Sequence, residues 1–158
     1  MDRPAEFTED MIEQLRAIGL RLDRSGKFWH QGAEVTHPRL RQALLRWLDV
    51  RDDGRDIVRL DATRYAYVEI EDAHLRALGA RWDGDRCVVH WDDATESELD
   101  YRSLHQAADH ALYAHVRGAL RGRIAGPGYH AVAERIAEVP GGFALDAAGQ
   151  RWPIAGAA

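Results

Sequence analysis

Two sets of histidines in this sequence could do chemistry, and the first lies in the stretch FWHQGAEVTHPRL at residues 28–40. It places His30, Glu34 and His37 within eight positions, and these are donor types that bind zinc. Zinc requires three or four such donors to converge at about 2 Å, and the helical His-Glu-x-x-His spacing that brings them together is absent. The pattern instead predicts a strand at His30, a turn at Glu34 and a helix cap at His37. We therefore interpret this cluster as a fold signature.

The second set, His105, His110 and His115, has a regular five-residue spacing. If residues 111–117 form a strand, His110 and His115 lie on opposite faces, because side chains alternate along a strand. A mobile loop would still bring His105 and His110 together, which leaves a loose divalent-metal site open. A metal-dependent hydrolase that uses some of the histidines of both sets, with Glu71 or Asp72 as the base, is therefore the alternative function.

Two strand-like segments each carry aromatic and charged side chains on one face. In RYAYVEIED, the residues Ala66, Val68 and Ile70 alternate with tyrosines and glutamates, and ALYAHVRG shows a similar alternation. If two halves of the fold bring these faces together, they would form a groove suited to a small anionic ligand or a peptide. The predicted ligand-binding residues are Tyr67, Glu69, Glu71, Tyr113, His115 and Arg117. The alternative is a cross-strand salt-bridge surface with half-buried tyrosines.

The sequence lacks the common catalytic motifs. It has no Gly-Lys-Ser/Thr phosphate loop, no Gly-x-Ser-x-Gly elbow and no Gly-x-Gly-x-x-Gly turn after a strand. Cys87 lies in an apolar strand-like run, which predicts a buried and inert thiol. We therefore assign no catalytic residue, no metal and no cofactor, and we favour a non-enzymatic binding or regulatory module.

The composition predicts an ordinary soluble protein. With 158 residues, of which 46% are apolar, the chain is long enough for one compact domain, residues 1–158. The net charge of -5 and the lack of a basic block argue against nucleic acid as a partner. The single cysteine cannot form an internal disulfide, and no export signal or run of roughly eighteen apolar residues is visible. We therefore expect a cytoplasmic protein that does not bind membranes.

Hydrophobic periodicity and turn residues predict a regular succession of hairpins and helices. The expected elements are a helical arm at 8–18, a hairpin at 20–31, a helix at 37–49, a hairpin around 61–63, a middle hairpin around 83–85, a hairpin around 117–119, a helix led by Pro127 and a hairpin turning at 148–149. The helix at 37–49 carries an apolar stripe that includes Trp47, which we expect in the core. The polar run TESELDYRSLHQ, residues 95–106, predicts a loop.

The order hairpin, helix, hairpin occurs twice, with an offset of roughly ninety residues. This order predicts an α+β fold made of two pseudo-repeated ββαββ units with antiparallel sheets. The units would span residues 20–72 and 110–155, joined by the middle hairpin and preceded by the N-terminal helix. Coincidence is the alternative, because short connections between common elements recur by chance.

We also expect the chain to form homo-oligomers. Trp29 and Trp152 lie on hairpins after turns, where partial exposure would let them anchor a partner, because interfaces concentrate tryptophan and arginine. Packing in the core is the alternative role for each of these two side chains.

Four stretches occur in the order FWHQGAEVTHPRL, YVEIEDA, ALYAHVRGALRGRIAGPGYHAVAE and GGFALDAAGQRWPI. With these stretches the chain resembles the bacterial family called Domain of Unknown Function 1285, over most of residues 20–154. In that family an aromatic pair precedes a turn glycine, as Phe28, Trp29 and Gly32 do here, and an acidic pair follows a strand, as Glu71 and Asp72 do. The family has no established activity. The resemblance therefore implies a soluble bacterial protein with a two-part, mixed α and β fold.

Overall fold

The computed structural model describes residues 16–156 of the chain. These residues belong to two compact units, of which the first ends at Asp72 and the second begins at Ala73. The predicted helical arm at residues 8–18 lies for the most part outside the described residues. The single compact domain expected for residues 1–158 stays a prediction.

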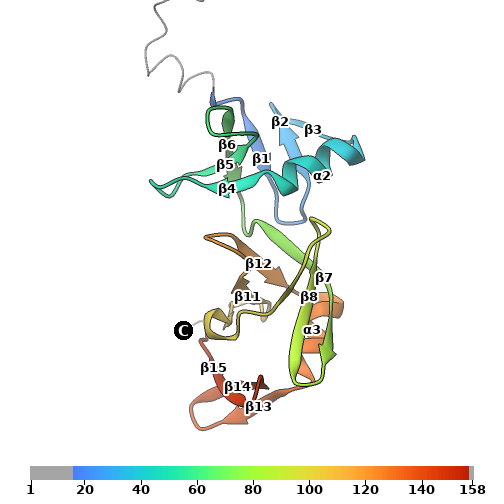
Figure 1. The fold of residues 1–158 in the computed structure, drawn as a ribbon, viewed down its shortest axis with the longest axis vertical. Helices are drawn as coiled ribbons and strands as arrows, with labels where there is room; N and C mark the ends of the chain where they lie inside the picture. Colours follow the sequence, from blue (N-terminus) through green and yellow to red (C-terminus); the bar gives the residue numbers. More distant parts are fainter. Residues whose placement is uncertain (1–15, 157–158) are drawn as a thin grey trace, which may run out of the picture. The chain divides into compact units, whose positions relative to one another are not determined.

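The first unit contains a six-stranded sheet and the helix α2 (Figure 1). Its elements are β1 (Leu20–Leu22), β2 (Phe28–His30), β3 (Ala33–Glu34), α2 (Pro38–Arg46), β4 (Leu48–Val50), β5 (Asp56–Arg59) and β6 (Tyr65–Ile70). The strand order β3-β2-β1-β6-β5-β4 consists of two antiparallel meanders, β1–β3 and β4–β6. The two meanders are joined at the centre of the sheet by β1 and β6, which come first and last in the sequence and pair in parallel, with Leu20 beside Val68.

Both hairpins predicted for this unit are present. β1 and β2 pair around a turn in which the backbone N–H of Gly26 donates to the carbonyl of Asp23 at 3.1 Å. Gly26 has a φ of 91°, which a residue with a Cβ adopts only at a cost. β5 and β6 pair around a second turn, where Asp61 Oδ1 accepts from the backbone N–H of Thr63 and Arg64.

The core of the first unit comes from alternate positions on the strands and from one stripe of the helix. Its buried apolar side chains include Leu20, Leu22, Phe28, Leu44, Leu45, Leu48, Ile57, Val58 and Val68. Burying each such side chain contributes roughly 1.5–3 kcal/mol. The buried strand residues share one apolar face of the sheet, except Ile57, which lies beside Tyr67 on the other face, and polar residues alternate with them along the strands.

The helix α2 begins as predicted and ends earlier than predicted. His37 caps its N-terminus, since Nδ1 accepts from the backbone N–H of Leu40 at 3.3 Å, and Pro38 occupies the first turn. The helix ends at Arg46, because Leu48–Val50 pair with β5 instead of continuing it. Trp47 is the C-cap and remains 36% exposed, so its predicted place in the core is wrong.

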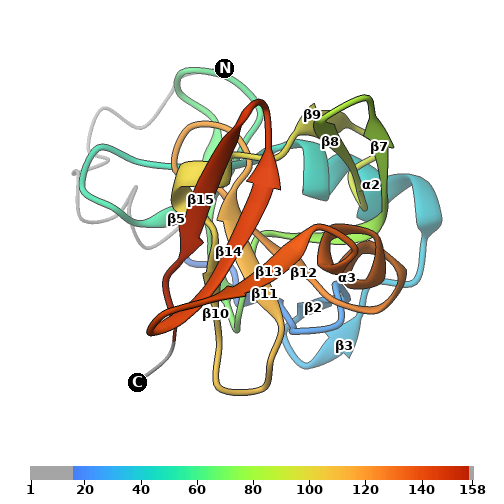
Figure 2. The same cartoon turned by 90° about the horizontal axis from the view of Figure 1, so that it is seen from below.

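The second unit contains another six-stranded sheet, a three-stranded sheet and the helix α3 (Figure 2). Its elements are β7 (Leu75–Asp83), β8 (Arg86–Trp91), β9 (Glu96–Glu98), the 3-10 helix η1 (Tyr101–Ser103), β10 (His105–Gln106), β11 (Leu112–His115), β12 (Arg121–Ile124), α3 (Gly126–Ala133), β13 (Ile136–Val139), β14 (Gly142–Ala147) and β15 (Gln150–Ile154). The predicted hairpins β7–β8, β11–β12 and β14–β15 are all present. The segment expected to be a loop at residues 95–106 instead holds β9, η1 and β10.

The two six-stranded sheets share one strand order. In the second sheet, the meanders β7–β9 and β10–β12 are joined by a parallel pairing of β7 with β12, with Leu75 beside Gly122. The repeat in strand order therefore relates Leu20–Ile70 to Leu75–Ile124, not to the predicted range 110–155. The helix α3 follows the second sheet, whereas α2 lies between the meanders of the first, so the two helices are not counterparts.

The fold is thus of the predicted α+β class, with sheets that differ from the predicted ones. Each six-stranded sheet is mixed, because one parallel pair joins its antiparallel meanders. The prediction of two ββαββ units with purely antiparallel sheets is therefore wrong in this respect. Among residues 16–156, neither helix is long and apolar enough to cross a lipid bilayer.

Candidate functional site

The polar face of the first sheet gathers aromatic and arginine side chains from five strands and turns. Cross-strand pairs share a face, and the register sets Arg21 beside both Trp29 and Glu69, and Arg59 beside Tyr65. Alternation along β6 adds Tyr67 to the same face. We call this surface the arginine–tyrosine face, and it consists of Arg21, Trp29, Arg51, Arg55, Arg59, Tyr65, Tyr67 and Glu69.

Guanidinium groups stack on the aromatic rings of this face. The guanidinium carbon of Arg55 lies 3.4 Å from the ring centre of Tyr67, and that of Arg51 lies 5.2 Å from the ring centre of Tyr65. Arg51 also donates to the Tyr67 hydroxyl through Nη1. The two tyrosine rings meet edge to face at 6.0 Å. Such contacts contribute about 0.5–2 kcal/mol each and favour positions of the guanidinium groups over the rings.

A hollow of about 490 Å³ opens on one part of the arginine–tyrosine face. The side chains with functional groups that line it are Arg21, Trp29, Arg55, Asp56, Tyr67 and Glu69. The backbone of Gly19, Gly32 and Gly54 forms other parts of its wall, and Arg21 lies over the Trp29 ring at 5.5 Å. The hollow therefore combines two arginines that lie over aromatic rings with two carboxylates.

Ion pairs partly neutralise the positive charge of the arginine–tyrosine face. Arg59 Nε lies 2.9 Å from Asp49 Oδ2, and Arg21 Nη1 lies 3.5 Å from Glu71 Oε2. Both pairs are partly exposed to solvent, so each contributes little to stability. The predicted alternative of a salt-bridge surface thus describes part of this face.

Two of the three ligand-binding residues predicted in the first unit line the hollow. Tyr67 and Glu69 do so from β6, and Glu69 pairs in register with Arg21 of β1. Glu71 follows the end of β6 and has a different environment. Its Oε2 accepts from the backbone N–H of Arg24 at 3.1 Å, so this carboxylate ties β6 to the turn after β1.

Tyr113, predicted as a ligand residue in the second unit, is only 8% exposed. Its hydroxyl accepts from Arg123 Nη1 at 2.5 Å, and its ring stacks on His105 with a centre distance of 5.5 Å. Arg123 also pairs with Asp109 at 2.9 Å. The register explains this row, because Tyr113 of β11 lies opposite both His105 of β10 and Arg123 of β12.

The other two predicted residues of the second unit also have structural partners. The backbone N–H of His115 donates to Ser103 Oγ at 2.8 Å, and its side chain is exposed. Arg117 Nη2 lies 2.6 Å from Asp93 Oδ2. Burial raises the pKa of Asp93, but hydrogen bonds from Thr95 and Arg117 outweigh this effect and hold the pKa below its usual value.

The six predicted ligand-binding residues are thus divided equally between the two units. Within the first unit the structure brings Tyr67 and Glu69 together, and it adds Arg21, Trp29 and Arg55 to them. The groove expected between the two sheets stays a prediction, as does the meeting of Glu69 and Glu71 with His115 and Arg117.

The histidines considered as metal ligands are dispersed within their units. His37 caps α2, His105 stacks on Tyr113, and His110 lies in a turn with a φ of 72°. His30 of β2 is exposed. Among residues 16–156, no group of three or more His, Cys, Asp or Glu side chains is arranged to hold a metal ion. The alternative of a metal-dependent hydrolase therefore has no converging ligand set in this part of the chain.

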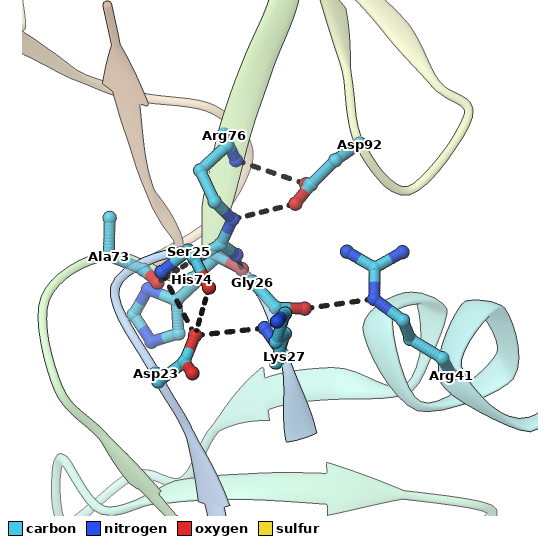
Figure 3. A network of polar contacts seen from close by, with 9 residues as sticks. All are labelled: Asp23, Ser25, Gly26, Lys27, Arg41, Ala73, His74, Arg76 and Asp92. Carbon is cyan, nitrogen blue, oxygen red and sulfur yellow. Dashed lines mark hydrogen bonds and ion pairs between the residues drawn. The ribbon is translucent and has the colours of Figure 1, made fainter. Parts of the chain in front are cut away.

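A buried polar cluster in the second unit was not expected from the sequence. Figure 3 shows Arg76 with Asp92, whose Oδ2 lies 2.6 Å from Arg76 Nε, and the same arginine donates to the carbonyls of Ala73 and His74. His74 is fully buried, and its Nδ1 accepts from the backbone N–H of Arg121 at 2.9 Å. This cluster links the start of β7 to β12, so its role is to fix the parallel pair.

Figure 3 also shows the turn after β1 in the first unit. There Asp23 Oδ1 accepts from Ser25 and from the backbone N–H of Lys27. Asp23 Oδ2 accepts from Trp29 Nε1 at 2.9 Å. Partial burial raises the pKa of Asp23, but these hydrogen bonds outweigh it and lower the pKa to about 2. The carboxylate therefore orients Trp29 at the hollow.

The sequence interpretation missed Arg21 and Arg55 as candidate site residues. Arg21 lies in the alternating stretch LRL of β1, and Arg55 lies in the turn DVRDDGRD. The sequence signal for Arg55 is its position just before a predicted strand, DIVRL, that forms a hairpin with RYAYVEIE. No local signal marks Arg21, because only the parallel pairing of β1 with β6 sets it beside Glu69.

Comparisons with known proteins support the fold of this chain. No family model matches the sequence, and no curated protein does. A solved DUF1285 family protein from Silicibacter pomeroyi is similar, with a TM-score of 0.73, 18% identity, and coverage of 88% of this chain and 80% of that chain. A DUF1285 family protein from Shewanella baltica has a TM-score of 0.63, 16% identity, and coverage of 75% and 93%. The resemblance noted in the sequence is thus confirmed as a likeness of fold.

Proposed function

We propose that this chain, which shares the fold of these DUF1285 proteins, is a non-enzymatic binding module for a small anionic ligand. The observation that carries the proposal is the hollow of about 490 Å³ on the arginine–tyrosine face, into which Arg21 and Arg55 contribute guanidinium groups. A volume of this size lies in the range of roughly 300–1,000 Å³ that small-molecule sites occupy.

The stacking of the arginines supports an anionic ligand. A guanidinium that lies flat on an aromatic ring keeps its in-plane N–H donors at the edge, where they can bind a carboxylate or phosphate through two parallel bonds. The guanidinium carbon of Arg55 lies 3.4 Å from the ring centre of Tyr67, a distance that suits this arrangement, and that of Arg21 lies farther from the Trp29 ring centre, at 5.5 Å. Because the rings already restrict the arginine side chains, less conformational entropy is lost when a ligand binds.

The two carboxylates in the hollow disfavour ligands that carry only negative charges. Asp56 and Glu69 lie in the same wall as the arginines, so a ligand with only negative groups would meet repulsion on one side. A molecule with one anionic group and a hydrogen-bond donor or ammonium group satisfies both parts of the wall. A small metabolite with both groups suits the hollow better than a long protein segment.

A binding role suits the side chains of the hollow better than catalysis does. Among residues 16–156, those that line it include no Ser, Thr, Cys, His or Lys side chain, and we assign its Asp56, Glu69 and Tyr67 to binding the ligand. Homo-oligomer formation and a regulatory role remain part of the proposal. Trp29 is only partly buried, so its ring is available to contact a second copy of the chain.

Nuclear magnetic resonance of the whole ¹⁵N-labelled chain tests this proposal. The probes are inorganic phosphate, succinate and glutamate, and the reporters are the amides of Gly19, Gly32 and Gly54, which lie in the wall of the hollow. We expect saturable shifts of these amides, largest with glutamate, which carries both anionic and ammonium groups.

Variants locate the binding. Arg55→Gln should weaken it roughly tenfold or more, since a hydrogen bond to a charged group is lost. Arg81→Gln is the matched control, because Arg81 pairs with Glu96 on an exposed strand surface of the second unit, and it should bind as the wild type does. If none of the three probes shifts these glycines, or if Arg55→Gln binds as tightly as the control, the proposal fails.

A further inference from the structure

A second cavity lies wholly within the second unit, and residues of the three-stranded sheet, α3 and the edge of the six-stranded sheet line it. Figure 2 shows these elements as ribbons. Its volume is about 190 Å³. The residues that line it are Gln106, Leu112, Tyr129, Ala133, Ile136, Glu138, Phe143 and Ile154. They come from β10, β11, α3, β13, β14 and β15, so the cavity is formed by the fold of this unit and not by one loop.

The size of the cavity sets the size of a ligand. An apolar cavity of about 150 Å³ holds one benzene molecule, so a slightly larger one accommodates a six-membered ring with a short substituent. The walls suit such a ring, because Leu112, Ile136 and Ile154 supply aliphatic surface and Phe143 supplies an aromatic ring. Phe143 is 48% exposed, so it stands at the mouth of the cavity.

The charge of the cavity sets the chemistry of the substituent. Glu138 is the charged residue among those that line it, and its side chain is exposed at the rim. Gln106 and Tyr129 are the other polar residues there, and both are neutral. A cation is therefore attracted to the rim and an anion is repelled from it. The rings of Tyr129 and Phe143 add to this preference, because an ammonium group is also attracted to aromatic faces.

We propose that this cavity binds a small arylalkyl amine, with its ring among the apolar side chains and its ammonium group at the Glu138 carboxylate. This site is separate in residues and opposite in charge preference from the hollow of the first unit, so the two proposals stand or fall independently. Glu138 of β13 pairs in register with Phe143 of β14, which places the anionic and aromatic partners of the ammonium group side by side.

The experiment compares three ligands on the whole chain, each with one benzene ring and a short polar substituent: benzylamine, benzyl alcohol and benzoate. Methyl resonances of Ala133, Ile136 and Ile154 report on binding, because these side chains line the cavity. We expect benzylamine to bind with a dissociation constant on the order of 0.1–1 mM, as befits a ligand with about eight heavy atoms. Benzoate should bind at least roughly tenfold more weakly, because its charge has the same sign as that of Glu138.

Two variants separate the ring pocket from the charged rim. Glu138→Gln should reduce the affinity for benzylamine several-fold and leave that for benzyl alcohol unchanged. Ala133→Leu should fill the cavity and abolish the binding of both ligands, while thermal unfolding reports whether the variant is folded. The proposal is overturned if benzoate binds as tightly as benzylamine, if Glu138→Gln leaves benzylamine binding unchanged, or if benzylamine shifts none of the three methyl groups.

Discussion

Arg117 Nη2 lies 2.6 Å from Oδ2 of Asp93, whose side chain is completely buried. The same carboxylate accepts from the hydroxyl and the backbone N–H of Thr95 through Oδ1. An arginine that the sequence marked as a ligand-binding residue thus compensates a buried charge. A buried carboxylate without partners is costly, so the pair stabilises the turn between β8 and β9.

Replacing Arg117 should therefore destabilise the protein. Arg117→Gln leaves Asp93 buried with fewer partners, and we expect a loss of about 1–3 kcal/mol in the free energy of unfolding. The loss stays below that of a wholly buried pair because the Arg117 side chain is 43% exposed. Urea denaturation measures it. Arg81→Gln, which removes an exposed ion pair with Glu96, should leave the midpoint unchanged; equal midpoints for the two variants would contradict the structural role.

Gly122 should tolerate no side chain. A Cβ at this position of β12 would overlap the ring of Trp91, which is 1% exposed, and would also press on Val116. Gly122→Ala should therefore cost about 1–3 kcal/mol, since a packed core does not absorb an added methyl group. Gly79→Ala is the control, because a Cβ there meets no atom within 4 Å. It should leave stability unchanged or raise it by up to about 1 kcal/mol. Chemical denaturation of both variants measures the change in the free energy of unfolding, and equal values for the two would contradict the prediction.

Asp23 should make stability depend on acidic pH. Its pKa is lowered from 3.8 to about 2, so its contribution is present above 3.8 and is lost as the pH falls toward 2. After allowance for solvent screening, Asp23→Asn should cost about 1–2 kcal/mol near pH 6 and about half as much near pH 3, because pH 3 lies between the two pKa values. Urea midpoints of variant and wild type at both pH values test this. A difference that does not shrink in acid would count against it, and Asp52→Asn, on an exposed turn, serves as the control.

Cys87 should react with thiol reagents only when the second unit opens. Burial raises the pKa of its thiol to about 11, the charge of Arg135 opposes this, and the charge of Glu98 adds to it. Thiolates react and thiols do not, so modification near pH 8 should be at least about a hundredfold slower in the native protein than in urea. Absorbance of the released thiol dye measures the rate. Comparable rates in the two states would show that the site is open.

The variant Tyr101→Phe tests whether the hydrogen bonds of β8, the strand that carries Cys87, control access to the thiol. The Tyr101 hydroxyl accepts from the backbone N–H of Cys87 at 2.9 Å and donates to Glu98 at 2.8 Å. Its loss leaves the buried backbone donor of Cys87 without its partner, at a cost of about 1–3 kcal/mol. The variant should therefore open more often, and the native rate of thiol modification should rise. An unchanged rate would mean that opening of this strand does not control access.

The hairpins were predictable because their signals are local. The turns at Gly26, Gly84 and Gly149 have positive φ values, and alternating residues flank each of them. The short strands β4, β9 and β10 lack such signals. Leu48–Val50 continue the apolar stripe of α2, and only pairing with β5 makes them a strand. Tertiary pairing thus overrides the local pattern there.

The candidate site was predictable only in part, for the same reason. Alternation places Tyr67 and Glu69 on one face of β6 whatever the neighbouring strands are. Which side chains join them depends on the strand order, and the parallel pairing with β1 brings Arg21 from almost fifty residues away. The two strands that join the meanders lie far apart in the sequence, so no short window of residues reveals their partnership.

The parallel pairing of the first and last strands also governs how each sheet is completed during synthesis. In both six-stranded sheets the central partners, Leu20 with Val68 and Leu75 with Gly122, lie roughly fifty residues apart. Closing so long a loop makes their pairing non-local and therefore slow relative to hairpin formation. Until β6 leaves the ribosome, one edge of β1 remains without its strand and is able to accept the β6 of another chain. We therefore expect exchange of this strand between nascent copies to be the main route by which this sheet misfolds.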